Sequence, residues 1–467
     1  MRTFVLPGLL LALVVFPGEA QVSSPTNYFS VKQDNGIWWF VDPNGNEFIS
    51  KGIDNTSYAQ DATSLQGDSP FKITNDKKYG NKDAWRKAIE KRLADYGFNT
   101  AGAWSDPLFV GAQLDAQHYL AETKVINIGS RFVSQQLGNG PGRWKHQGVF
   151  PDVFDPAFKK YAEQTANEQC RADRNNPWLI GWFSDNELRW CSDWRSREEQ
   201  LVSFLNLPPE SAGHHAAVAL LQSRYPDIAH FNAIWKTTFT SWHDLDAQLH
   251  VPAPYYIHNI LAQNESANYQ VTDPATKQYL ADCYTFAGEM AEEYFRITTE
   301  AIKQADPHHL LLGCRFAIPP PPPVVYAAAK YLDVVSFNCY MVDPVKTVAY
   351  YAKNSGRPLL IGEFGFRAKD SGLPNTKGAG PLVDNEQERA SAFELYVRSA
   401  LSNPNLIGYH WFEHADEPKE GRYDGENSNY GIVDINDNPY IPLTDKMTSV
   451  NGEAEKIHQA AEKPSEQ

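Results

Sequence analysis

The sequence predicts a single (β/α)8 barrel, and three observations carry that prediction. Eight short apolar runs alternate with amphipathic helical patterns over most of the 467 residues. The runs are continuously apolar, which is typical of strands buried on both faces of a parallel sheet. No glycine-rich phosphate loop follows the first run, and this disfavours the alternative architecture, an open doubly wound sheet. Eight βα units are what a closed barrel needs.

The predicted strands are read from the apolar runs. In chain order they cover residues 48–54, 98–104, 125–128, 178–183, 310–314, 334–337, 359–362 and 406–411. Helical patterns between them have recognisable ends. Asp155-Pro156 supplies a cap and a first-turn proline for one helix, and a long helix is expected over 284–305. Asp384 with Gln387 resembles the capping box of a third helix.

Three further segments complete the expected organisation. Residues 27–50 contain a β-hairpin, because Asp42-Pro43-Asn44-Gly45 is a turn sequence between two apolar runs. Residues 191–282 form a helix-rich insertion between the fourth and fifth strands. The insertion includes an amphipathic stretch over 220–245, and we expect it on one side of the barrel mouth. Residues 445–467 are expected as a C-terminal tail.

The first residues, 1–20, have the pattern of an export signal. Arg2 precedes an apolar run over 6–16, and Gly18-Glu19-Ala20 forms a small-residue cleavage site. The alternative is a membrane anchor, but an anchor needs ~20 apolar residues and this run is shorter. We therefore expect a secreted chain, 21–467, that forms one domain and has no membrane partner after signal cleavage.

Composition narrows the function classes. The 42 Lys and Arg residues against 57 Asp and Glu give a net charge of −15, which disfavours a nucleic-acid partner or a polyanionic substrate. The 12 Trp, 23 Tyr and 24 Phe residues exceed ordinary usage, as a sugar-binding groove would require. Five cysteines match no zinc spacing, and their odd number leaves at least one thiol free while one bridge stays possible. We expect no metal and no cofactor.

Two glutamates follow predicted strands at the end where barrel enzymes place their chemistry. Glu187 follows the fourth strand, and Glu363 follows the seventh within Gly-Glu-Phe. An unpaired carboxylate next to a buried run costs several kcal/mol, so a functional reason is expected. Two facing carboxylates can divide the roles of acid and nucleophile. The alternative is that each merely pairs with an arginine or caps the next helix.

This pair resembles that of the retaining glycoside hydrolases built on (β/α)8 barrels, which carry Asn-Glu after strand four and a glutamate after strand seven. Longer motifs resemble the bacterial β-agarase family: residues 155–158, 177–187, 410–416, 424–427, 431–434 and 439–440. The stretch 231–239 is similar to the related acid β-galactosidases. The resemblance covers nearly all of residues 21–467.

The resemblance implies a role for each matching residue. Glu187 would be the general acid/base and Glu363 the nucleophile. Asn186 would bind the sugar 2-hydroxyl, and Tyr340 would hold the nucleophile ionised. Trp411, on the last strand, would form the aromatic floor under the reacting sugar.

Position alone suggests four more binding residues, because they end strands one, two, five and six: Asn55, Trp104, Arg315 and Asn338. One departure from the family pattern stands out. Many members carry an arginine after strand two, whereas this chain has Ala103-Trp104-Ser105 there. Arg315 is the candidate to supply the missing positive charge from strand five.

The implied activity is cleavage of β-galactosidic linkages in a galactan such as agarose or its oligosaccharides. A retaining enzyme of this kind would hold its two carboxyl groups ~5–5.5 Å apart. Two alternatives stay open: a β-glycosidase acting on another polysaccharide, such as a mannan or glucan, and a barrel that binds carbohydrate without catalysis. Substrate specificity depends on the βα loops, so the strand residues do not predict which of these sugars is cleaved. The oligomeric state is not predicted.

Overall fold

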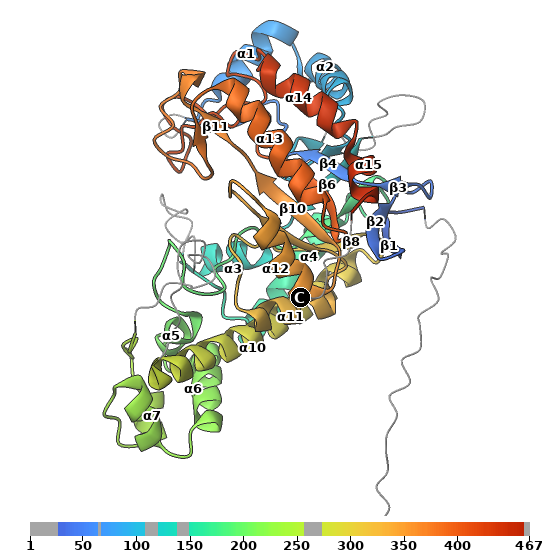
Figure 1. Cartoon of the computed structure of the whole chain (residues 1–467). Coiled ribbons are helices and arrows are strands. Elements are labelled where there is room, and N and C mark those ends of the chain that lie inside the picture. The colour runs from blue at the N-terminus through green and yellow to red at the C-terminus, as the bar shows by residue number, and fades with distance from the viewer. Residues whose placement is uncertain (1–26, 64–66, 108–119, 138–148, 256–272, 462–467) are drawn as a thin grey trace, which may run out of the picture.

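The computed structural model describes residues 27–63, 67–107, 120–137, 149–255 and 273–461, and its centre is a parallel eight-stranded sheet curled into a barrel (Figure 1). The order β8-β7-β6-β5-β4-β13-β10-β9 follows the chain around the barrel. Phe316, shortly after β8, closes the barrel against β9. Its N–H donates to the Ser336 carbonyl, and its own carbonyl accepts from the Asn338 N–H. The predicted barrel is confirmed.

The barrel strands are short and almost wholly buried. Their bounds are β4 Ser50–Ile53, β5 Thr100–Ala101, β6 Ala121–Val125, β7 Leu179–Phe183, β8 Leu310–Gly313, β9 Val335–Asn338, β10 Leu359–Phe364 and β13 Leu406–Trp411. The position expected for the third strand, 125–128, was wrong. The strand ends at Val125, and α3 (Ile128–Leu137) begins within the expected range. Glu122 and Lys124 form an ion pair within β6, which hides the strand from an apolar pattern.

Helices cover the outside of the barrel. Their bounds are α1 Pro70–Tyr79, α2 Lys82–Asp95, α4 Pro156–Cys170, α10 Pro274–Ala305, α11 Pro322–Tyr331, α12 Val345–Ser355 and α13 Glu386–Leu401. Asp155 caps α4 as expected, by accepting from the Ala157 N–H. The cap of α13 lies one residue later than expected, because Asn385 accepts from the Glu388 N–H. The long helix α10 begins ten residues before the expected start.

The N-terminal segment has one strand more than the predicted hairpin. It forms an antiparallel sheet of β1 (Ser30–Asp34), β2 (Ile37–Val41) and β3 (Glu47–Phe48). Phe29 and Phe40 are buried with Ile180 and Leu312 in a cluster inside the barrel. The segment therefore packs against the end of the barrel opposite the carboxyl ends of the strands.

The expected C-terminal tail, 445–467, is helical where it is described. Its residues belong to α14 (Ile441–Asn451) and α15 (Ala454–Gln459), and both helices pack on α13. The expected signal, 1–20, lies outside the described residues. In the part of the chain that the structure covers, no helix is long and apolar enough to cross a membrane. All five cysteines lie within the described residues and are buried, and the structure joins none of them in a disulfide.

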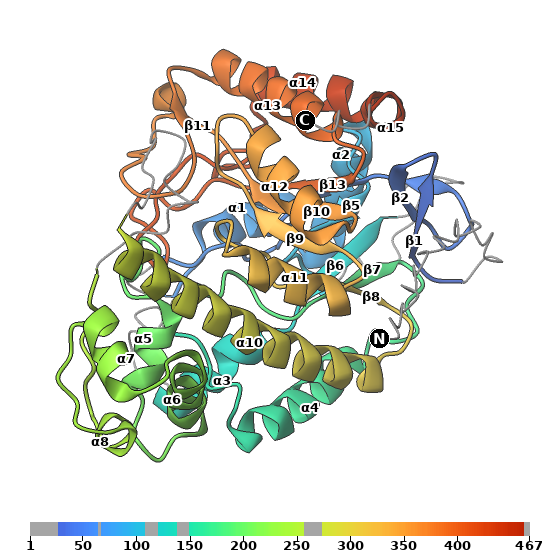
Figure 2. The ribbon, with the colours of Figure 1, turned by 60° about the horizontal axis from the view of Figure 1, so that its bottom comes forward.

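The described residues of the insertion contain four short helices beside the first half of α10 (Figure 2): α5 Gln200–Leu205, α6 Ala212–Arg224, α7 Ile228–Trp235 and α8 Trp242–Asp246. The stretch 220–245, expected as amphipathic, is therefore divided among three of them. Asp282 of α10 joins α6 to α7, because its carboxylate accepts from Arg224, Tyr225 and Trp235. The barrel, with this insertion on one side, positions the residues described next.

Candidate active site

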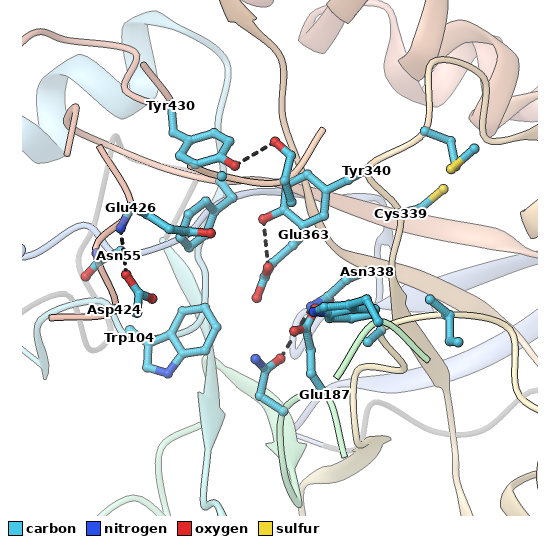
Figure 3. A pocket seen from close by; sticks show the side chains of 18 of the residues that line it. Asn55, Trp104, Glu187, Asn338, Cys339, Tyr340, Glu363, Asp424, Glu426 and Tyr430 are labelled. Carbon is cyan, nitrogen blue, oxygen red and sulfur yellow. Dashed lines mark hydrogen bonds between the residues drawn. The ribbon is translucent and has the colours of Figure 1, made fainter. Parts of the chain in front are cut away.

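A cavity of about 800 Å³ opens at the carboxyl ends of the barrel strands (Figure 3). Seven of the nine residues that the sequence suggests line it: Asn55, Trp104, Asn186, Glu187, Asn338, Tyr340 and Glu363. Arg315 lies directly behind the cavity wall, and Trp411 lies elsewhere. The topology thus brings together residues that are up to 308 positions apart in the chain.

Glu363 is nearly buried at the end of β10. The Tyr340 hydroxyl donates a hydrogen bond of 2.7 Å to its Oε2 atom. The Arg315 Nη2 atom lies 3.1 Å from its Oε1 atom. Each carboxylate oxygen therefore faces a group that stabilises negative charge.

Glu187 follows β7 in a left-handed backbone conformation, with φ of 54°. This conformation is costly for a residue with a side chain and persists only where the surroundings fix it. The surroundings do so here, because the Glu187 N–H donates to the carbonyls of Cys314 and Arg315, each at 3.2 Å. Asn338 Nδ2 donates to Glu187 Oε1 at 2.8 Å and contacts Asn186 Oδ1 at 3.4 Å. The side chain is thereby directed into the cavity (Figure 3).

Burial and the surrounding charges shift the pKa of Glu363. Burial is the largest influence on the pKa of Glu363 and raises it to about 8. The Arg315 guanidinium opposes this rise in pKa, whereas the nearby Glu187 carboxylate adds to it. The Glu363 carboxyl group is therefore harder to ionise than a glutamate in water.

Arg315 provides the positive charge that the strand-two sequence lacks. It is fully buried, and its Nη2 atom donates to Asp54 Oδ2 at 2.7 Å and to the Gly362 carbonyl at 2.6 Å. The Trp104 ring covers this guanidinium, and its centre lies 4.4 Å from the Arg315 Cζ atom. Trp104 stands at the position of the arginine in the family pattern described above. Strand five therefore supplies the cation, and strand two supplies an aromatic surface over it.

The expectation for Trp411 is corrected by the structure. Its side chain is fully buried, does not line the cavity, and donates from Nε1 to the Tyr430 carbonyl at 2.9 Å. The ring packs among Phe364 and Phe393 instead. The reason is that neighbouring side chains of a strand point to opposite sides, so the next residue, Phe412, lines the cavity.

Several other lining residues were not singled out for the site from the sequence. They come from loops that follow strands and carry no periodic pattern: Asp61, Trp194, Arg422, Tyr423, Asp424, Glu426 and Tyr430. Asp424 and Glu426 stand within a motif that the sequence does reveal, 424–427. Figure 3 shows both on one side of the cavity, with Glu187 and Asn338 on the other.

The carboxylates on that side are held by an arginine. Arg422 contacts Glu417 at 3.2 Å, Asp424 at 3.1 Å and Glu426 at 2.6 Å. Asn55 donates to the buried Glu413, whose pKa burial raises well above its usual range. Among the residues described, no group of three or more His, Cys, Asp or Glu side chains is arranged to hold a metal ion. Glu417, Asp424 and Glu426 thus form an ion network centred on Arg422.

Comparisons with known proteins agree with this geometry. A family model described as β-galactosidase matches residues 147–362. β-Agarase A of Vibrio sp. (strain JT0107) is 30% identical over 494 residues, which cover 93% of this chain and 46% of that protein. β-Agarase B of the same organism is 26% identical and covers 91% of this chain and 48% of that protein. The chain spans about half the length of these curated relatives.

Solved structures give the same picture. An agarase crystal structure superposes with a TM-score of 0.73 at 27% identity, covering 94% of this chain and 66% of that chain. An exo-β-agarase has a TM-score of 0.74 at 24% identity with the same coverage, a likeness that shows the fold alone. The chain is therefore a (β/α)8-barrel protein of the glycoside hydrolase type, related to β-agarases and β-galactosidases.

Proposed function

We propose that the chain is a retaining β-glycosidase that cleaves galactosidic linkages in a galactan such as agarose or its oligosaccharides. The observation that carries the proposal is the shared cavity of Glu187 and Glu363. One carboxylate there contacts an arginine and a tyrosine, and the other accepts from an amide. Carboxyl groups that line one cavity from β7 and β10 can act on the two sides of a single glycosidic bond.

The two proposed roles require an ionised nucleophile at Glu363 and a proton donor at Glu187. Arg315 and Tyr340 both stabilise negative charge on Glu363, whereas Asn338 offers Glu187 a neutral donor. The burial that raises the pKa of Glu363 works against this distribution. The developing positive charge on the sugar favours it, since that charge is stabilised by an ionised Glu363.

The reaction then runs in two displacements. Glu363 attacks the anomeric carbon and forms a glycosyl ester. At the same time the bond to the leaving sugar breaks, and the Glu187 proton moves to its oxygen. Glu187 next removes a proton from water. The resulting hydroxyl group bonds to the anomeric carbon, and the Glu363 carboxylate is released. Two inversions leave the β configuration unchanged.

The other lining residues have supporting roles. Asn186 and Asn55 offer amide groups to sugar hydroxyls within the cavity. Trp104 and Phe412 offer rings to the apolar faces of sugars, and their centroids lie 6.2 Å apart at nearly a right angle. Sugar-binding sites commonly combine such apolar surfaces with a few directed polar groups.

The substrate proposal rests on the relatives and on charge. The relatives named above are β-agarases, and the matching family model is that of a β-galactosidase. Asp61, Asp424 and Glu426 line the cavity beside the catalytic pair. These carboxylates outnumber the Arg422 cation that lines the cavity with them, so sulfate esters and uronates are repelled and a neutral galactan is favoured. A β-mannan or β-glucan hydrolase and a non-catalytic binding barrel are the competing functions.

Product analysis on purified polysaccharides tests the proposal. Incubation with agarose oligosaccharides is expected to release products whose first-formed anomer, observed by proton NMR, is β. Glu363→Gln and Glu187→Gln should each reduce turnover by several orders of magnitude with the fold intact. Initial α products would exclude the covalent mechanism. Hydrolysis of mannan or glucan alone would establish the first competitor, and saccharide binding without turnover the second.

We also propose that the protein is exported, with the segment 1–20 as its signal. The support is the order of a basic residue, an apolar run of signal length and small residues near 20. Expression of the full chain in a secreting host, followed by N-terminal sequencing, should give Gln21 as the first residue. Retention of residues 1–20 on a membrane-bound product would contradict this.

A further inference from the structure

Trp194 is an exposed aromatic residue at the cavity. Its side chain lines the cavity, yet 66% of its surface is accessible to solvent. It comes from the insertion that follows β7, seven residues after Glu187. A large apolar ring left open at a polar cavity is a feature of ligand-binding surfaces.

The ring is held by its neighbour in the chain. The Arg195 guanidinium carbon lies 4.6 Å from the centre of the Trp194 ring. Arg195 is itself fixed, because its Nε and Nη2 atoms donate to Asp193 Oδ2 at 2.9 and 2.6 Å. The Asp193 side chain is buried, so the pair is shielded from water. The tryptophan therefore stands on a rigid support.

The same arginine connects the ring to the acid/base residue. Arg195 Nη1 donates to the backbone carbonyl of Glu187 at 2.5 Å. One guanidinium thus contacts both the exposed ring and the segment that carries the carboxyl group. A ligand that rests on the ring therefore lies in the cavity that the Glu187 side chain also lines.

We propose that Trp194 is the stacking platform for the sugar on the leaving-group side of the scissile bond. The inference rests on the proposed function and deepens it. A general acid must reach the glycosidic oxygen, which joins the cleaved sugar to the leaving sugar. The ring connected to Glu187 therefore belongs to the leaving sugar, whereas Glu363 contacts the anomeric carbon of the other.

The chemistry of the ligand supports this position. A β-galactose ring presents several C–H groups on one face, and these pack against an indole ring. Across the cavity from Glu187 lies the Arg422 network with Asp424 and Glu426, which suits hydroxyl groups (Figure 3). A neutral galacto-oligosaccharide across the cavity would meet an apolar surface at one end and hydrogen-bonding groups at the other.

A comparison of two substrates tests the platform. Both share the same glycon, but one is an agarose oligosaccharide and the other a glycosyl fluoride, whose leaving group cannot stack. For Trp194→Ala, kcat/KM on the oligosaccharide should fall about tenfold or more, the loss expected for one stacked ring. On the fluoride it should change less than about twofold, which lies within the error of such a comparison. Trp194→Phe should retain most of the oligosaccharide activity.

A matched control is Tyr326→Ala on α11, which removes an exposed ring that does not line the cavity. It should leave both substrates unaffected. Equal losses on the two substrates for Trp194→Ala, or no loss on either, would overturn the proposal. Addition of a galactoside acceptor gives a second measurement, because the platform should favour transfer to the acceptor over water. The Trp194→Ala variant should lose that preference.

Binding separates this inference from the proposed function. In the Glu363→Gln background, titration calorimetry with agarose oligosaccharides should show weaker binding when Trp194→Ala is added. This result would show that the Trp194 ring contacts the oligosaccharide even if the native chain hydrolysed no galactan and the proposed function failed. Equal affinity of the two variants, or no binding by either, would overturn the platform.

Discussion

Arg315 Nη2 lies 3.1 Å from Glu363 Oε1, although β8 and β10 are separated in the barrel by β9. The same atom lies 2.7 Å from Asp54 Oδ2 at the end of β4. One guanidinium therefore joins three strand ends inside the barrel. Glu363 thus has Arg315 as its electrostatic partner, and Asp54 competes for the same guanidinium. Mutations of Arg315 and Asp54 separate the two effects.

Arg315→Met removes the cation beside Glu363. The pKa of Glu363 should rise, because Arg315 lowers it in the native chain. A neighbouring arginine typically shifts a carboxyl pKa by about 1–3 units. The acid limb of the pH profile of kcat/KM should therefore move to higher pH by about that amount. An unchanged acid limb in a folded variant, checked by circular dichroism, would contradict the ion-pair role.

Asp54→Asn should move the same limb in the opposite direction. Asp54 raises the pKa of Glu363 through its negative charge, so its neutralisation lowers that pKa. The amide has the same shape as the carboxylate and can still accept from Arg315. A general loss of structure would move the two variants in the same direction, whereas an electrostatic role moves them apart. The measurement is the pH profile of kcat/KM for both variants and the native enzyme.

Tyr340→Phe removes one hydrogen bond and no charge. Its hydroxyl donates to Glu363 Oε2 at 2.7 Å and lowers the pKa of that carboxyl group. The acid limb should rise, but less than in Arg315→Met, since a neutral donor stabilises a carboxylate less than a cation does. kcat and kcat/KM should both decrease, and KM should change little. A shift as large as that of Arg315→Met would contradict this ranking.

The fold was largely predictable because a parallel barrel buries both faces of its strands. Seven of the eight strands therefore appeared as apolar runs, whereas β6 did not, because Glu122 and Lys124 satisfy each other within it. When both faces of a strand are buried, however, the apolar run does not show which of its side chains face the inside of the barrel. Trp411 and Phe412 both belong to an apolar segment, and the pattern does not show which of them faces the cavity.

The site was predictable where polar residues end strands. Glu187, Glu363 and Asn338 follow this rule, and the absence of an arginine after strand two made Arg315 the candidate for the positive charge. The contact between Arg315 and Asp54 depends on the closure of the barrel, which no sequence pattern shows. Trp194 comes from a loop without periodicity, so only coordinates reveal that it lines the cavity.

Gly102→Ala should disturb the same network from strand two. A Cβ atom at this position would lie 2.0 Å from Asp54 Oδ1 and 3.0 Å from the Ile53 carbonyl. Asp54 must move, and its bond to Arg315 with it, so we expect a loss of activity and about 1–3 kcal/mol of stability. Urea unfolding and kcat measure the two effects.

Gly452→Ala serves as the control for that substitution. Its φ is −67°, and the nearest atom to a new Cβ is the Thr448 carbonyl oxygen at 3.3 Å. Stability and turnover should remain close to native. If Gly102→Ala proved equally harmless, the packing between Gly102 and Asp54 would be looser than the structure requires.

Asp437→Asn should destabilise the fold in a pH-dependent manner. The buried Asp437 carboxylate accepts from Arg92 at 2.5 Å and from Lys78 at 2.8 Å. Its positive φ of 60° is also accessible to asparagine, so the backbone should tolerate the change. Removal of one partner from a buried ion pair costs about 3–5 kcal/mol, because the remaining charge loses its compensation.

The pH dependence follows from the direction of the pKa shift. After the cost of burial, the bonds from Arg92 and Lys78 lower the pKa of Asp437 below its ordinary value. A lowered folded-state pKa gives stability that is complete above the unfolded-state pKa of about 4 and is lost as the pH falls towards the folded-state pKa. The difference in unfolding free energy between the native chain and Asp437→Asn should thus be largest near pH 7 and shrink below about pH 4.

Urea unfolding at pH 7, 5 and 3 provides the measurement, with Asp434→Asn as the control in the same turn. Asp434 accepts hydrogen bonds from Asn436 and Asn438 rather than from cations. Its replacement should therefore cost less at pH 7, because no buried cation loses its counter-charge. A stability difference for Asp437→Asn that stayed constant from pH 7 to 3 would show that the carboxylate contributes by shape alone. The ion pair with Arg92 would then not be what fastens the C-terminal segment to α2.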